Sequence, residues 1–155
     1  MKIVKRIGIV AHDNRKKDIM EWVEWNNDIL SGHKLICTGT TGKLVEEVMH
    51  KNLKKGEKLA HEIIRLKSGP LGGDQQLGAM IVNGEIDMLI FFWDPMQAQP
   101  HDVDVKALLR ITVLYNIPTA CNRSSADFMI SSELMFHKYI PIVKDYSEYI
   151  NRSIE

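Results

Sequence analysis

The sequence predicts a three-layer α/β/α sandwich around a five-stranded, mainly parallel sheet, formed by a single domain that spans residues 1-155. Two observations lead to this prediction. Short apolar runs alternate along the chain with segments in which apolar residues recur at helical spacing. These runs are also nearly continuous, which is typical of parallel strands buried on both faces. No repeat, linker or low-complexity segment divides the 155 residues, a length that suits one compact domain.

Each element can be assigned in chain order from these patterns. The predicted strands are residues 5–11, 34–38, 63–67, 86–93 and 117–121. One helix is predicted between the first two strands and stops at Ser31-Gly32; its apolar positions are Ile19, Trp22, Val23, Ile29 and Leu30. Residues 39–42 are predicted to form a turn. A second helix is predicted to begin near residue 44. Further helices are predicted over 74–83, 103–115 and 126–135, and a last helix is predicted to begin near residue 145. Residues 50–58 have no readable pattern.

Composition narrows the range of partners and compartments. The 20 Lys and Arg residues balance 20 Asp and Glu residues, which argues against a dedicated nucleic-acid binder. The nearly apolar run 86–93 is too short to span a membrane, and the start of the chain lacks the features of a signal peptide. Cys37 and Cys121 lie in apolar runs and are predicted to be buried free thiols. We therefore expect a cytoplasmic protein that binds neither membranes nor nucleic acid.

Four loops at one edge of the predicted sheet carry the residues that could do chemistry. In open parallel sheets, ligands bind beyond the carboxyl ends of the strands. Because those ends meet at one edge, we expect the loops to form one site. The polar residues on them include His12, Thr38, Ser68, Asp74, Asp94, His101 and Asp104.

An anion site is predicted at the loops after the second and third strands. The TGTTG segment at 38–42 lies between a strand and a helix start, where free backbone N–H groups and the helix dipole favour an anion. The alternative is that both glycine-rich loops are ordinary turns whose glycines satisfy backbone geometry alone. The candidate ligands of a phosphate group are Lys16, Thr38, Gly39, Thr40, Thr41, Ser68 and Gly69.

Two titratable residues on these loops have competing interpretations. Asp74 is either a helix N-cap or a catalytic carboxylate. A helix N-terminus would stabilise its ionised form, whereas burial or nearby carboxylates would raise its pKa, and the sequence leaves open which effect dominates. His101 is either a solvated loop residue or a site residue, and Asp102 and Asp104 are natural capping residues for the next helix. No second ligand motif accompanies the HDVD segment, so no metal is expected.

The motifs on these loops make the chain resemble the methylglyoxal synthase family. They occur in that family's order, at closely similar spacing, and the likeness covers nearly the whole chain. The motifs are VAHD (10–13), TGTTG (38–42), SGPLGGDQQ (68–76), FFWDP (91–95), PHDVDVKALLR (100–110) and IPTACN (117–122). Residues 50–58 depart from the likeness, because this region is longer than expected for the family and contains no motif residue.

The resemblance implies a fold of the methylglyoxal synthase type and a lyase that converts dihydroxyacetone phosphate to methylglyoxal and inorganic phosphate, without metal or organic cofactor. Asp74 would be the base, and His101 would hydrogen-bond the carbonyl and hydroxyl oxygens. The acid–base set would be completed by His12, Asp94 and Asp104. His12 and His101 would also contact the bound substrate beside the anion site. The family further implies a homohexamer that is inhibited by phosphate.

Two other functions remain open at this point. A similar fold serves as the regulatory domain of carbamoyl-phosphate synthetase, where a loop such as TGTTG would sense a small anion without needing Asp74 or His101. The second alternative is a phosphosugar isomerase or an aldolase-like lyase, in which the same acid–base residues would act without expelling phosphate.

Overall fold

Five strands form one sheet in the order β3-β2-β1-β4-β5. The strands are β1 (Arg6–Ala11), β2 (Lys34–Thr38), β3 (Ile64–Leu66), β4 (Met88–Phe92) and β5 (Thr119–Ala120). Every pairing between neighbouring strands is parallel, which confirms the predicted sheet. The structure is a computed structural model, and it describes residues 1–54, 56–98 and 100–152.

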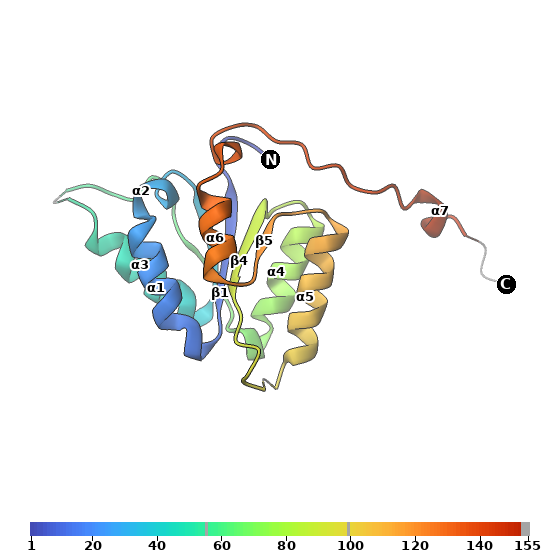
Figure 1. The fold of residues 1–155 in the computed structure, drawn as a ribbon, viewed down its shortest axis with the longest axis horizontal. Helices are drawn as coiled ribbons and strands as arrows, with labels where there is room; N and C mark the ends of the chain where they lie inside the picture. The colour runs from blue at the N-terminus through green and yellow to red at the C-terminus, as the bar shows by residue number, and fades with distance from the viewer. Residues whose placement is uncertain (55, 99, 153–155) are drawn as a thin grey trace.

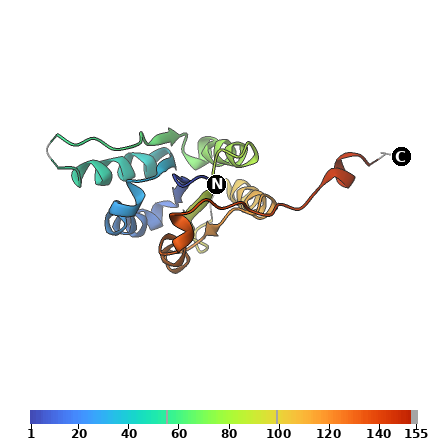
Figure 2. The ribbon, with the colours of Figure 1, turned by 90° about the horizontal axis from the view of Figure 1, so that it is seen from above.

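Helices cover both faces of this sheet, so the predicted three-layer architecture is confirmed (Figures 1 and 2). One face carries α1 (Lys16–Trp25), α2 (Asn27–Leu30), α3 (Gly39–Lys51) and α6 (Arg123–Ile130), and the other carries α4 (Gly73–Val82) and α5 (Asp102–Leu114). Three 3-10 helices cover Asp13–Arg15, Gly69–Leu71 and Glu133–Met135, and α7 (Ser147–Ile150) lies near the C-terminus.

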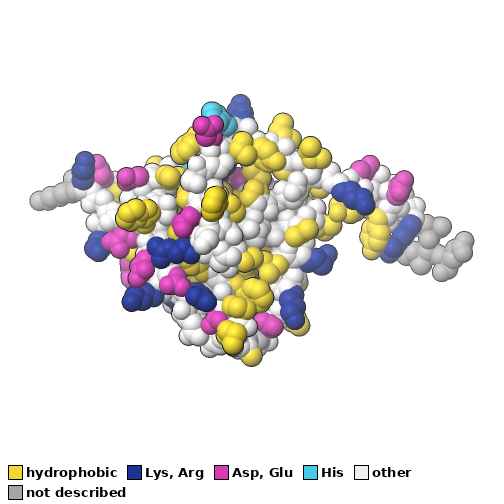
Figure 3. All heavy atoms as spheres, in the orientation of Figure 1, with side chains coloured by type: hydrophobic (Ala, Val, Ile, Leu, Met, Phe, Trp, Pro, Cys, Tyr) yellow, Lys and Arg dark blue, Asp and Glu magenta, His cyan; other side chains and the backbone are white. Residues whose placement is uncertain are grey.

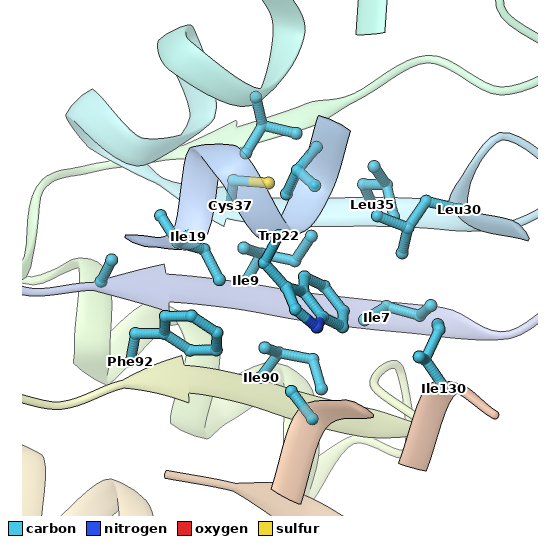
Figure 4. Close-up of a cluster of buried hydrophobic side chains, with 14 of the residues drawn as sticks. Ile7, Ile9, Ile19, Trp22, Leu30, Leu35, Cys37, Ile90, Phe92 and Ile130 are labelled. Atoms are coloured by element: carbon cyan, nitrogen blue, oxygen red, sulfur yellow. The ribbon is translucent and has the colours of Figure 1, made fainter. Parts of the chain in front are cut away.

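Alternate residues of the central strands contribute to two hydrophobic cores. Ile7 and Ile9 of β1 belong to the cluster that contains Trp22 of α1 (Figure 4). Val10, the next residue along β1, belongs instead to the cluster against α4 and α5. All five residues of β4 are buried, which explains its continuous apolar run in the sequence. Each large apolar side chain buried in this way stabilises the fold by about 1.5–3 kcal/mol.

The order of the strands reverses between β1 and β4, which lie side by side at the centre of the sheet. Their register pairs Ala11 with Phe92, and the backbone N–H of His12 donates to Phe92 O at 3.2 Å. The loops after the two strands therefore start from adjacent points. In open α/β sheets, ligands bind at this reversal, beyond the carboxyl ends of the strands.

The single helix predicted between β1 and β2 is wrong, because the chain forms two helices, α1 and α2. Asn26 separates them with a non-helical backbone (φ −100°, ψ 15°). Its side-chain amide donates to Trp22 O at 2.8 Å, and such local bonds compete with the helical hydrogen-bond pattern. Apolar spacing could not reveal this break, since Ile29 and Leu30 continue the helical period.

The turn predicted over residues 39–42 is also wrong, because Gly39 begins α3. Gly39 is required by close packing, since a Cβ atom there would lie 2.7 Å from Ser68 Cα. The helix continues to Lys51, so the first two residues of segment 50–58, which had no readable pattern, belong to α3. Residue 55 of that segment lies outside the described residues, as do residues 153–155 of the predicted domain.

Other predictions fail in part after α5. The helix predicted over 126–135 ends at Ile130, because the Ser132 side chain accepts a hydrogen bond from Leu134 N and caps a separate 3-10 turn. The last strand is only two residues long.

The prediction that both thiols are buried is confirmed for Cys37 and is wrong for Cys121. Cys121 follows β5 and is only half-buried. Burial raises the pKa of the Cys37 thiol.

The last part of the chain leaves the body as an arm (Figures 1 and 2). The Asn116 amide donates to Ile142 O at 2.8 Å and holds the start of the arm. Beyond Val143, the hydrogen bonds within the described residues join neighbours inside the arm. The helix predicted from residue 145 is reduced to the single turn of α7. No helix in the described part of the chain is both long and apolar enough to cross a membrane.

Candidate active site

A polar cavity of about 170 Å³ lies at the carboxyl edge of the sheet. It brings together the loops that follow β1, β2, β3 and β4, as the sequence predicted. Its lining contains every side chain proposed for the anion site, together with three residues that were not singled out, namely Ala11, Asp13 and Pro70. The full lining is Ala11, His12, Asp13, Lys16, Thr38, Thr40, Thr41, Ser68, Pro70 and His101.

Gly39 and Gly69 do not line the cavity, but each packs against a residue that does. A Cβ atom at Gly69 would lie 2.8 Å from His101 Nε2 and 3.2 Å from Asp74 Oδ2. The corresponding contact of Gly39 is with Ser68. Both glycines therefore allow the chain segments around the site to approach one another more closely than any larger residue would.

The N-terminus of α3 supplies the part of the lining that suits an anion. Thr38 is its N-cap, and in the described structure the Thr38 hydroxyl makes no capping hydrogen bond. Thr40 and Thr41 follow in the first turn, where backbone N–H groups have no partner within the helix. Together with the helix dipole, these groups favour a phosphate or carboxylate.

Lys16 begins α1 and lines the same cavity. Its ammonium group pairs with the carboxylate of Asp13, whose side chain is 83% exposed. An ion pair with such an exposed partner contributes little to stability. An anion that enters the cavity can therefore replace Asp13 as the partner of Lys16 at small energetic cost.

Asp74 and His101 form a buried pair beside the cavity. Asp74 Oδ2 lies 3.5 Å from His101 Nε2, and the two side chains are 2% and 9% exposed. The N-cap of α4 is Gly72 and Asp74 lies in the first turn, so the capping interpretation of Asp74 is wrong. The solvated interpretation of His101 is wrong as well, because the residue is buried. Within the described residues, Asp74 Oδ2 and His101 Nδ1 have no hydrogen-bond partner.

Burial is the dominant influence on the Asp74 carboxyl and raises its pKa. A positively charged His101 or His12 would lower that pKa, whereas the carboxylate of Asp104 raises it further. Burial and the nearby Asp104 carboxylate thus act in the direction that suits a base, which the sequence left open, and the net effect on the pKa of Asp74 is upward. A buried carboxylate with a raised pKa is a stronger base than a solvated one.

His12 lies across from this pair, with its ring centroid 6.1 Å from that of His101. Its Nδ1 atom accepts a hydrogen bond from the backbone N–H of Asp94 at 3.3 Å. Its Nε2 atom is buried and has no partner within the described residues. Burial lowers the pKa of His12, so its imidazole is neutral at pH 7.

Like Asp74, the other two predicted carboxylates, Asp94 and Asp104, lie outside the cavity lining. Asp94 is buried, and its Oδ2 atom accepts a hydrogen bond from Asn14 Nδ2 at 2.9 Å. This bond is the main reason that the pKa of Asp94 is lowered. Asp104 is half-buried in the first turn of α5 and acts on Asp74 through its charge. Asn14 was not singled out, because its partner is 80 positions away in the sequence.

A second cavity, of about 330 Å³, lies near the N-terminus and α6. Its lining is mainly apolar and includes Met88, Phe128 and the buried Lys5, but no carboxylate. The two imidazoles, by contrast, line the smaller, polar cavity, and Asp74 lies beside it in contact with His101. In the part of the chain that the structure describes, no three His, Cys, Asp or Glu side chains are grouped so that they could hold a metal ion.

The fold and this site define a doubly wound α/β protein with a buried carboxylate–imidazole pair next to a polar cavity at the strand-order reversal. A family model described as an MGS-like domain matches residues 18–121. The chain is 55% identical to a methylglyoxal synthase of Maridesulfovibrio salexigens, with 99% of this chain and 100% of the relative covered. It is 52% identical to one from Leptospira interrogans, with 96% and 94% covered.

A solved structure agrees with these relatives. The crystal structure of methylglyoxal synthase from Elizabethkingia anophelis matches with a TM-score of 0.88 and 48% identity, and the match covers 100% of this chain and 95% of that chain. The chain belongs to the methylglyoxal synthase family. These matches confirm the family that the sequence motifs indicated and the fold that this family implied.

Proposed function

We propose that this chain is a methylglyoxal synthase, a carbon–oxygen lyase that converts dihydroxyacetone phosphate to methylglyoxal and inorganic phosphate. The observation that carries the proposal is the buried pair of Asp74 and His101, 3.5 Å apart beside a polar cavity. The names of relatives that are about half identical over nearly the whole chain support it. A module that only senses an anion would have no need of this pair.

Asp74 acts as the base that removes a proton from the carbon next to the substrate carbonyl. A solvated Asp, with a pKa of about 3.9, would be a weak base for this step. Burial raises the pKa of Asp74, and its Oδ2 atom has no hydrogen-bond partner in the described structure. Both features favour proton abstraction by a carboxylate held in a fixed position.

The two imidazoles stabilise the enediolate that this step creates. His12 and His101 line the cavity, and each keeps one ring nitrogen without a partner among the described residues. Hydrogen bonds from such groups to the substrate oxygens become stronger as negative charge develops, and they typically contribute about 3–4 kcal/mol to catalysis. Asp104 supports the base by raising the pKa of Asp74.

The anion site then directs the fate of the enediolate. The phosphate group is held by Lys16, Thr38, Thr40, Thr41 and Ser68, with Gly39 and Gly69 keeping the surrounding segments close. Phosphate leaves when the breaking C–O bond stands out of the enediolate plane, because its electrons then overlap the π system. A bound substrate mimic with this bond in the plane would contradict that part of the mechanism.

The overall reaction requires no redox partner. Methylglyoxal and phosphoric acid together contain the same atoms and electrons as dihydroxyacetone phosphate, so elimination and proton transfer are sufficient. The proposed mechanism therefore uses side chains of this chain alone, without metal or organic cofactor.

Product analysis tests the proposal. Purified protein given dihydroxyacetone phosphate is expected to release methylglyoxal and inorganic phosphate in equal amounts. Formation of glyceraldehyde 3-phosphate without free phosphate would show an isomerase instead. Tight binding of anions without any turnover would show a regulatory module.

We also propose that the chain assembles into a homohexamer in the cytoplasm, where it draws triose phosphate away from glycolysis. The arm supports self-association, because it leaves Ile140, Ile142, Tyr149 and Ile150 exposed, and hydrophobic side chains remain uncovered along it (Figure 3). Inorganic phosphate would act as an inhibitor as well as a product, since it competes with the substrate phosphate for the same anion site.

A further inference from the structure

Asp94 differs from Asp74 in what surrounds its carboxylate. Its Oδ1 atom accepts a hydrogen bond from Met96 N at 3.0 Å, and its Oδ2 atom accepts one from Asn14 Nδ2 at 2.9 Å. Asp94 is buried and does not line the cavity. Both oxygens are therefore engaged by donors from the surrounding loops, whereas Asp74 Oδ2 has no hydrogen-bond partner among the described residues.

The backbone of Asp94 makes the contact that reaches the site. Its N–H donates to His12 Nδ1 at 3.3 Å. A ring nitrogen that accepts from an amide N–H carries no proton, so in the neutral imidazole the proton is on Nε2. His12 Nε2 is buried without a partner in the described part of the chain, on a side chain that lines the cavity. His12 is thus a neutral donor with one free N–H group.

We propose that Asp94 is a positioning residue that acts through His12. Asn14 and Met96 hold the Asp94 carboxylate, the carboxylate fixes the loop after β4, and the Asp94 amide then holds His12 as the Nε2–H tautomer. The role of the Nε2–H group as a donor to a substrate oxygen rests on the proposed function. The tautomer of His12 rests only on its hydrogen bond to the Asp94 amide. Asp94 then exchanges no proton with the substrate.

This role explains why the contact spans the centre of the sheet. His12 follows β1 and Asp94 follows β4, and these strands are parallel neighbours at the reversal of strand order. Asn14 reaches back from the 3-10 helix after β1 to the Asp94 carboxylate. The side-chain and backbone bonds together tie the two loops to each other, and one of them ends on the His12 ring.

Two substitutions at Asp94 separate positioning from proton transfer. Asp94→Asn keeps the backbone N–H and one acceptor oxygen, so kcat/KM is expected to stay within about tenfold of the wild-type value. Asp94→Ala removes both anchors, and kcat/KM is expected to fall by about a hundredfold, the scale of losing hydrogen bonds to a charged group. Asn14→Ala, at an exposed position, is expected to give a loss of about three- to tenfold. Asp28→Asn and Asp28→Ala at an exposed position of α2 are the matched controls.

The tautomer is measured without substrate, by ¹⁵N NMR of histidine-labelled protein with His12→Gln used for assignment. In the wild type and in Asp94→Asn, His12 is expected to show a protonated Nε2 and an unprotonated Nδ1. In Asp94→Ala, a mixture of the two tautomers is expected. An unchanged tautomer in Asp94→Ala, or a loss in Asp94→Asn as large as that in Asp74→Asn, would overturn the proposal. If the protein did not turn over dihydroxyacetone phosphate, the proposed function would be wrong. The NMR measurement of the His12 tautomer would still test the positioning role of Asp94, because it needs no substrate.

Discussion

Asp74 Oδ2 lies 3.5 Å from His101 Nε2, although the first residue belongs to the start of α4 and the second precedes α5. These two helices cover the same face of the sheet (Figure 1), so their N-termini bring the carboxylate and the imidazole together. Gly69 makes the arrangement possible, because a Cβ atom there would lie 2.8 Å from His101 Nε2. The pair is thus held by the helices on both sides and by a glycine beside it.

Gly69→Ala tests this relationship. The added methyl group would displace His101 from Asp74, and displacement of a catalytic group by about 1 Å can lower the rate about a hundredfold. We expect kcat to fall by about that factor in steady-state assays. Gly78→Ala in α4 is the control, since its Cβ atom would lie 3.7 Å from Ile111 Cδ1, an ordinary contact distance. Equal activity of the two variants would show that the contact at Gly69 is unimportant.

Lys16→Ala is expected to weaken substrate binding more than catalysis. Lys16 lines the cavity and contributes a positive charge to the anion site, so its loss should raise KM about tenfold, the scale of one charge-assisted hydrogen bond. Inhibition by inorganic phosphate should weaken by a similar factor. Lys17→Ala changes the exposed neighbouring lysine and should leave both constants near wild type. A normal phosphate inhibition constant in Lys16→Ala would remove Lys16 from the site.

Carboxyl ¹³C NMR measures the ionisation of Asp74 directly, with Asp74→Asn used for assignment. Because burial raises its pKa, Asp74 should titrate above an ordinary Asp, and activity should be lost as the pH falls through that value. His101→Gln removes an imidazole that lowers the pKa of Asp74 when charged, so the titration should move to higher pH. Titration at the ordinary value in the wild type would contradict the proposed base strength.

The same pKa direction makes a prediction about stability. The folded-state pKa of Asp74 lies above its unfolded value, so the folded protein binds this proton more tightly and loses relative stability as the pH rises through the folded-state pKa. At neutral pH, Asp74→Asn should therefore unfold at a higher temperature than the wild type in calorimetry, and below the pKa the difference should shrink. A lower melting temperature at neutral pH would argue against a destabilising buried carboxylate.

The fold and the edge of the sheet that carries the site could be predicted from the sequence because both depend on local patterns. Continuous apolar runs indicate a parallel sheet, and the carboxyl-end rule then selects the loops with His12, Thr38, Ser68 and Asp94. The interruption at Asn26 and the helical start at Gly39 were missed, because each depends on a specific contact. Those contacts are the Asn26 amide with Trp22 O and Gly39 with Ser68.

The organisation within the site could not be predicted for a related reason. Whether Asp74 is a cap depends on the residue at which α4 begins, and its strength as a base depends on burial, which follows from how α4 packs. The bond between Asn14 and Asp94 joins residues 80 positions apart, and nothing in the local sequence indicates it. Burial of His101 likewise follows from the packing of α5 beside α4 (Figure 1), so its loop position in the sequence was misleading.

The rate of methylglyoxal formation by Asp74→Asn, measured together with its affinity for inorganic phosphate, tests the central claim most directly. Asparagine has nearly the same shape as aspartate but cannot accept the proton. We expect the rate to fall at least about a thousandfold, the scale of losing a positioned base, while phosphate binding stays close to that of the wild type. A rate within about tenfold of the wild-type rate, with phosphate still bound, would contradict the assignment of Asp74 as the base.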